Sequence, residues 1–66
     1  MQVSINGKSE RVERPATLTD LLHRLDLDPR HVAVEVNRQL IPREQHRKYT
    51  LNDGDELEIV TLAGGG

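Results

Sequence analysis

Alternating apolar residues predict a β-hairpin at the start of the chain. Val3 and Ile5 fall on one face of a strand, with the period of two that a half-buried strand shows. Asn6-Gly7 follows, and this dipeptide favours a type I′ turn, in which both central residues need a positive φ. Residues 8–12 are then the returning strand, and Val12 is its expected inward contact.

A helix is predicted to begin at Thr17. Thr17, with Asp20 three residues later, matches the capping box, in which two side chains satisfy backbone N–H groups reciprocally. The leucines that follow fall at i, i+3, i+4 and i+7 and form one apolar stripe: Leu18, Leu21, Leu22 and Leu25. The helix is expected to end at Asp28-Pro29, because the residue before a proline is disfavoured in the α region. Its single apolar face needs a sheet beneath it.

The second half of the chain predicts further strands. Alternating valines favour a strand over 32–36, and a turn at 37–39 leads into a short strand at 40–41. The polar run 43–50 is expected at the surface, with Tyr49 and Leu51 as its anchors.

The turn cluster 52–55 precedes the last predicted strand, 56–62, in which Leu57 and Ile59 face inward. Glu56 and Glu58 face outward, where their charge is expected to discourage edge-to-edge pairing. The order of hairpin, helix, strand, short strand, loop and strand predicts an α+β roll of β-grasp type. In such a roll a mixed four- to five-stranded sheet packs on one main helix.

The composition restricts the functions that this fold can serve. The chain has 66 residues, no cysteine and one aromatic residue, so it is expected to form one domain over 1–62 without room for a deep catalytic cleft. The formal net charge is −2 and aromatic residues are nearly absent, which argues against a nucleic-acid partner. No apolar run approaches the length of a membrane span, so we expect no membrane partner and a cytoplasmic location.

No residue of the chain is predicted to be catalytic or to bind a metal. His23, His31 and His46 lack a second ligand at a recognised metal spacing and are expected to be exposed to solvent. Glu56 and Glu58 face outward, without the apolar surroundings that raise the pKa of a carboxyl group, so neither is expected to act as a general acid. The sequence therefore predicts that the protein is not an enzyme.

The chain ends in Ala63, Gly64, Gly65 and Gly66, which we expect to form a flexible tail over 63–66. One interpretation is a frayed terminus or a cloning remnant. The other is a carboxylate on Gly66 that passes through a narrow channel into the active site of another protein. Val60, Leu62 and Ala63 are then a possible docking patch beside the tail, although Val60 and Leu62 are as consistent with covering a helix or loop.

The ordered set of these segments resembles one family. The matching pieces are the first strand at 1–3, the leucine helix, the segments 32–37 and 41–43, the turn 52–55 leading into 58–60, and the terminal Gly-Gly. Together they span essentially the whole chain, and they are similar to the ThiS family, the ubiquitin-like β-grasp sulfur carriers of thiamine biosynthesis. The resemblance favours a functional tail.

The resemblance implies a mechanism and a set of partners. An E1-like activating enzyme would use ATP and Mg²⁺ to adenylate the Gly66 carboxylate. Sulfur from a cysteine desulfurase or another persulfide donor would then displace AMP and leave a thiocarboxylate, which thiazole synthase would consume. Gly64 and Gly65 would keep the tail slim enough to enter both active sites. The chain itself would bind no cofactor and would act as a protein co-substrate.

Related functions remain as alternatives. The small sulfur-carrying subunit of molybdopterin synthase, a carrier for tRNA thiolation and a ubiquitin-like modifier share the fold and the Gly-Gly end. A β-grasp module that only binds other proteins belongs to a different class, and it would not need a free Gly66 carboxylate.

Overall fold

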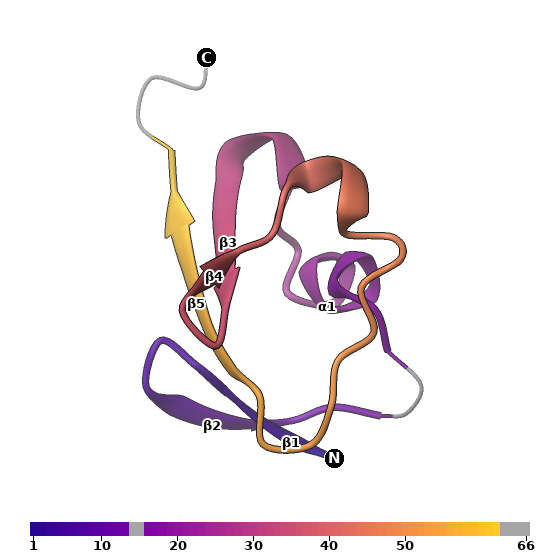
Figure 1. Ribbon diagram of the computed structural model, residues 1–66, viewed down its shortest axis with the longest axis vertical. Helices are drawn as coiled ribbons and strands as arrows, with labels where there is room; N and C mark the ends of the chain where they lie inside the picture. Colours follow the sequence, from indigo (N-terminus) through magenta and orange to yellow (C-terminus); the bar gives the residue numbers. More distant parts are fainter. Residues whose placement is uncertain (14–15, 63–66) are drawn as a thin grey trace.

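In the described part of the chain, five strands form one mixed sheet that curls around one α-helix, α1 (Figure 1). The computed structural model describes residues 1–13 and 16–62. The sheet has the order β2-β1-β5-β3-β4, with β1 and β5 parallel and every other neighbouring pair antiparallel. The bounds are Gln2–Ile5 for β1, Lys8–Arg11 for β2, Leu18–Arg24 for α1, Val32–Val36 for β3, Gln39–Leu40 for β4 and Glu56–Thr61 for β5. This architecture confirms the predicted α+β roll, with five strands in its sheet.

The predicted hairpin forms as expected. Asn6 and Gly7 have φ angles of 52° and 82°, the positive values that a type I′ turn requires. The register pairs Ile5 with Lys8 across the turn, and Val3 points into the core with 2% of its surface exposed. Val12 follows β2 and is buried, as predicted.

The start of α1 is also as predicted. The Asp20 backbone N–H donates to Thr17 Oγ1 at 3.2 Å, and the Thr17 backbone N–H donates to Asp20 Oδ2 at 3.0 Å, which completes the capping box. The apolar stripe packs against the inner face of the sheet, where Leu18, Leu21 and Leu22 are at most 2% exposed.

The end of α1 differs from the prediction. The helix ends at Arg24 rather than at Asp28-Pro29, because Asp26 adopts a left-handed conformation with φ 60°. The Asp26 N–H donates to the His23 carbonyl at 3.1 Å and the Leu27 N–H donates to the Leu22 carbonyl at 2.9 Å, which is the Schellman pattern. Leu25 therefore leaves the buried stripe and is 36% exposed.

The segment 43–51 crosses the start of α1 and binds its free backbone donors. The first of these donors, Leu18 N–H, reaches the Tyr49 carbonyl at 3.0 Å, and Thr19 N–H reaches the His46 carbonyl at 3.2 Å. A short 3₁₀ turn, η2 (Arg43–Gln45), begins the segment, and Leu51 anchors its end in the core as predicted.

His46 is buried, so its predicted exposure is wrong. Its side chain is 3% exposed, and Nε2 lies 3.0 Å from the Ile41 carbonyl oxygen. Because a carbonyl oxygen only accepts, Nε2 carries the proton of this hydrogen bond. His46 thereby joins the end of the short strand to the loop that crosses the helix. His23 and His31 are exposed as predicted.

The left-handed residue at the end of α1 gives a test of the helix boundary. Asp26→Gly is expected to raise the free energy of unfolding by about 0.5–1 kcal/mol, because glycine has no Cβ to strain at positive φ. Asp26→Ala is expected to lower it by about 1 kcal/mol. Urea unfolding of both variants measures the two shifts. Equal midpoints for the two variants would show that residue 26 is not strained.

Candidate functional site

The candidate site lies on the outer face of β5, the strand that leads to the end of the sequence. β5 occupies the centre of the sheet, pairing with β1 through Ile5–Leu57 and with β3 from Val32–Thr61 to Val36–Leu57. Leu57 and Ile59 point toward α1 as predicted. The alternate residues face away from the helix and form the outer face of β5, the strand that ends at Thr61 (Figure 1).

An apolar strip lies on this outer face. Val60 and Leu62 are 54% and 46% exposed, so the hypothesis that they cover a helix or loop is wrong. Ala33 pairs with Val60 in the β3–β5 register, and Leu40 pairs with Glu35 on the same face with 61% of its surface exposed. We call this set the outer apolar strip: Ala33, Leu40, Val60 and Leu62. Exposed apolar clusters of this kind are typical of surfaces that bind other proteins.

The point at which the chain leaves the sheet is anchored. Leu62 is the last described residue, and its backbone N–H donates to the His31 carbonyl at 2.8 Å, one step beyond the Val32–Thr61 pair. The predicted tail residues Ala63, Gly64, Gly65 and Gly66 lie outside the described residues, as does the predicted boundary between the domain and the tail. The sheet therefore fixes the backbone of Leu62, the last residue before 63–66.

The carbonyl that holds Leu62 comes from a well-capped turn. Residues Pro29–His31 form a 3₁₀ turn, η1, whose Arg30 N–H donates to Asp28 Oδ1 at 2.9 Å. Side-chain and backbone hydrogen bonds from Arg30 hold the pKa of the Asp28 carboxyl well below its usual range. This local contact orients η1 and so the His31 carbonyl.

Two asparagine side chains hold β5 in place. β1 ends at Ile5, but Asn6 continues its pairing: Nδ2 donates to the Ile59 carbonyl at 3.0 Å and Oδ1 accepts from the Ile59 N–H at 2.9 Å. At the other end, Asn37 Oδ1 accepts from the Glu56 N–H at 3.0 Å. Both asparagines have a φ of 52°. From the sequence both asparagines are predicted only as turn residues, because these bonds join them to a strand that is distant along the chain.

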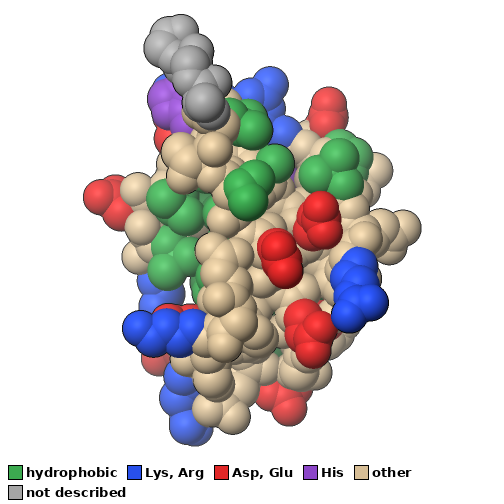
Figure 2. Space-filling model, turned by 90° about the vertical axis from the view of Figure 1, so that its left-hand side faces the viewer, with side chains coloured by type: hydrophobic (Ala, Val, Ile, Leu, Met, Phe, Trp, Pro, Cys, Tyr) green, Lys and Arg blue, Asp and Glu red, His purple; other side chains and the backbone are tan. Residues whose placement is uncertain are grey.

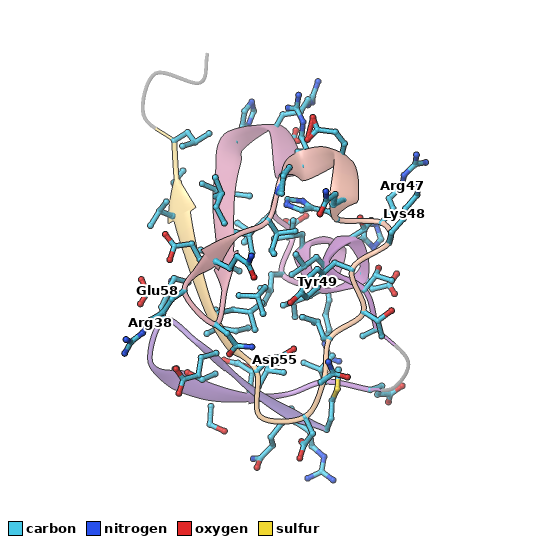
Figure 3. All side chains as sticks on the ribbon, in the orientation of Figure 1. Arg38, Arg47, Lys48, Tyr49, Asp55 and Glu58 are labelled. Carbon is cyan, nitrogen blue, oxygen red and sulfur yellow. The ribbon has the colours of Figure 1, made fainter. Side chains whose placement is uncertain are left out.

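Asp55 is a buried carboxylate, although its sequence pattern predicts only an ordinary turn. Its side chain lies at the base of the sheet (Figure 3) and is 7% exposed. Oδ1 accepts from Asn37 Nδ2 at 3.0 Å, and Oδ2 accepts from the Asn52 N–H at 2.8 Å. Asp55 thus joins the turn after β3 to the turn before β5, and it positions Asn37 for its contact with β5.

The role predicted for Glu56 and Glu58 is wrong. Both are exposed on the outer face, as expected, but β5 is the central strand, and the edge strands of the sheet are β2 and β4. The register instead sets Glu58 directly opposite Glu35 of β3. Figure 2 looks onto this face and shows acidic side chains beside the hydrophobic ones. The face therefore combines the outer apolar strip with carboxylates.

A shallow hollow of about 240 Å³ lies between the two hairpin turns on the same face. Its lining comprises Ser4, Gly7, Arg38, Glu56, Leu57 and Glu58. Figure 3 shows Arg38 and Glu58 together on this side of the sheet, whereas Arg47 and Lys48 lie on the opposite side of the molecule. Within residues 1–13 and 16–62 no group of three or more histidine or acidic residues is placed to hold a metal ion.

In the described part of the chain, no helix has the length and apolar character needed to cross a membrane.

Comparisons with known proteins identify similar chains. A family model described as the ThiS family matches residues 3–66. The sulfur carrier protein ThiS of Escherichia coli is 30% identical over 66 residues, which cover all of both chains. The crystal structure of the thiamine biosynthesis protein (ThiS) from Geobacter metallireducens superposes with a TM-score of 0.85 at 33% identity, again over all of both chains.

A further relative joins a similar region to a larger protein. A thiazole synthase of Paramagnetospirillum magneticum is 41% identical over all 66 residues, which make up 20% of that protein. The chain thus spans one fifth of the length of this relative. In that relative, a region similar to the whole of this chain lies in the same polypeptide as the rest of the synthase.

The buried carboxylate of Asp55 gives a test of how the site is positioned. Asp55→Ala leaves two donors without their acceptor and is expected to lower the free energy of unfolding by about 2 kcal/mol. Glu44→Ala, which removes an exposed carboxylate on η2, should change it by less than about 0.5 kcal/mol. Urea unfolding measures both. An equal effect of the two substitutions would contradict the role given to Asp55.

Proposed function

This chain belongs to the ThiS family, and from that premise we propose how it acts as the sulfur carrier of thiamine biosynthesis. The sulfur is held as a thiocarboxylate on Gly66. The observation that carries the proposal is the family match over residues 3–66, which includes the glycine-rich end. The hydrogen bond from the Leu62 N–H to the His31 carbonyl supports the proposal. Because it fixes the last residue before 63–66, a partner that binds the outer face of β5 also sets the point from which the tail extends.

The proposed chemistry begins with activation of the Gly66 carboxylate. A carboxylate is a poor electrophile and has to be activated. In the active site of a partner adenylating enzyme, the Gly66 carboxylate attacks the α-phosphate of ATP, pyrophosphate leaves and an acyl adenylate forms. Mg²⁺ in that enzyme offsets the charge of the phosphates. The catalytic groups belong to the partner, and this chain is its substrate.

Sulfur transfer begins from this acyl adenylate, a mixed anhydride whose AMP is a good leaving group. The terminal sulfur of a persulfide, supplied by a cysteine desulfurase or another donor, attacks the Gly66 carbonyl carbon and AMP leaves. A second thiol then cleaves the sulfur–sulfur bond, which leaves the thiocarboxylate on Gly66 and a disulfide on the donor side. Gly64 and Gly65 carry no side chain that would obstruct a narrow channel in either partner.

Thiazole synthase is the proposed acceptor of the sulfur. The Paramagnetospirillum magneticum relative supports this choice, because it contains a region similar to this chain within a protein named thiazole synthase. The comparisons lend no comparable support to a molybdopterin, tRNA-thiolation or protein-modifier role, or to a plain binding module. We also propose a cytoplasmic location, where ATP for the adenylation step is available.

The proposed carrier chemistry is tested by mass spectrometry. With ATP, Mg²⁺, a persulfide donor and the adenylating enzyme, the intact chain is expected to gain the mass that replaces one oxygen by sulfur, confined to Gly66. Gly65→Ala is expected to slow pyrophosphate exchange about tenfold or more, because the added methyl group widens the tail that has to enter the active site of the adenylating enzyme. Its unfolding midpoint should stay unchanged. No mass gain with the wild-type chain would refute the proposal.

Docking is proposed on the part of the outer face nearest the tail, which comprises Val60 and Leu62, while the predicted patch residue Ala63 lies outside the described residues. Leu62→Ala is expected to weaken binding to the partner enzymes about tenfold, because it removes an exposed apolar side chain beside the tail. Leu25→Ala is the matched control, since Leu25 is also exposed but lies at the end of α1. Isothermal titration calorimetry measures both affinities. Equal losses for the two variants would contradict docking at this face.

A further inference from the structure

The backbone of β5 is held to different lengths by its two neighbouring strands. Toward β3, pairing continues to the end of β5, where the Leu62 N–H reaches the His31 carbonyl at 2.8 Å. Toward β1, backbone pairing stops early, because its last bond runs from the Asn6 N–H to the Leu57 carbonyl at 2.9 Å. The second half of β5 therefore depends on a different kind of contact on its β1 side.

The side chain of Asn6 supplies that contact. Its amide binds both backbone groups of Ile59, donating from Nδ2 to the carbonyl at 3.0 Å and accepting at Oδ1 from the N–H at 2.9 Å. Because the backbone groups of a strand point alternately to its two neighbours, the next residue that faces the β1 side is Thr61. Within the described residues Thr61 has no hydrogen bond on that side, so Asn6 makes the last one there.

The turn between β1 and β2 does not by itself require an amide at position 6. Asn6 has a φ of 52°, and a type I′ turn accepts aspartate or glycine at this position as well. Aspartate has no N–H to donate to the Ile59 carbonyl, and glycine has neither the donor nor the acceptor. The contact with β5, rather than the turn, is therefore what an asparagine provides here.

A strand that is bonded along both edges has a fixed orientation in the sheet. A strand that is bonded along one edge can turn about that line of bonds. Without the Asn6 amide, the part of β5 from Ile59 onward would be bonded only to β3 and to the His31 carbonyl. The Asn6 side chain therefore restricts the direction in which the chain leaves the sheet after Leu62.

We propose that Asn6 is a positioning residue for the adenylation of Gly66, about sixty residues away along the chain. It takes no part in the chemistry and acts only through β5, by holding Ile59 so that the chain after Leu62 starts in the direction of the partner's active site. This inference rests on the proposed sulfur-carrier function, because it concerns the same carboxylate.

The expected effect of Asn6 is on turnover rather than on binding. Val60 and Leu62, the proposed docking residues, keep their bonds to the β3 side when the Asn6 side chain is removed, so docking to the adenylating enzyme is retained. A smaller share of the docked chains would then direct the carboxylate to ATP. Because misplacing a reacting group by about 1 Å costs up to about 100-fold in rate, a loss of about tenfold in kcat is expected.

Asn6→Gly and Asn37→Gly form a matched pair of variants. Both asparagines have a φ of 52°, which glycine adopts without strain, and each substitution removes two side-chain hydrogen bonds. Asn37→Gly also takes a donor from the buried carboxylate of Asp55, so it should lower the unfolding midpoint at least as much. Asn37 binds the first residue of β5, whereas Asn6 binds the half that leads to Leu62.

Pyrophosphate exchange by the adenylating enzyme, measured over a range of chain concentrations, gives kcat and KM for each variant. Asn6→Gly is expected to lower kcat about tenfold with KM nearly unchanged, and Asn37→Gly should keep both constants of the wild-type chain. Asn6→Asp tolerates the positive φ and keeps the acceptor for the Ile59 N–H, so its kcat should lie between those of the wild type and Asn6→Gly.

The outcomes separate this inference from the proposed function. If the wild-type chain gains no sulfur in the mass assay, the proposed function fails. If it gains sulfur but Asn6→Gly keeps the wild-type kcat, or if both glycine variants lose turnover equally, the positioning role of Asn6 is overturned. A rise in KM alone overturns it as well, because the effect would then be on docking. Should Asn6→Gly not fold, a wild-type kcat for Asn6→Asp overturns the role.

Discussion

The central position of β5 is the constraint on which the rest of the structure depends. A central strand must pair its backbone on both sides, yet β1 pairs with only the first part of β5. Asn6 supplies the missing pairing with a side-chain amide, and Asn37 pairs with the first residue of β5. With β5 held in this way, its inward residues cover α1 and its last bonds fix the start of the tail.

The two faces of β5 serve different purposes. The inner face stabilises the fold, because Leu57 and Ile59 are buried under the helix. The outer face adds little to stability, since its apolar side chains stay exposed and Glu58 lies opposite the like charge of Glu35. An exposed apolar surface beside the start of the proposed reactive tail suits binding to another protein. The enzymes that use the tail are the proposed partners.

Local patterns predicted the elements well, and they failed where a residue acts on a distant segment. The Asn6-Gly7 turn and the Thr17 capping box depend on neighbours in the sequence, so both were predicted. The end of α1 was missed because Asp26 takes a conformation that glycine usually occupies. The burial of His46 was missed because its partner, the Ile41 carbonyl, comes close only once the loop folds across the helix.

The sequence by itself determined which strand residues face inward, which turns form and where a glycine-rich end follows an apolar strand, since these follow from short-range periodicity and turn chemistry. Strand order was decided only by the tertiary structure, because pairing between β1 and β5 joins segments about fifty residues apart. That order removed the edge role predicted for Glu58 and set it against Glu35. It also brought the His31 carbonyl close to Leu62, and the hydrogen bond between them holds the last residue before 63–66 on the sheet.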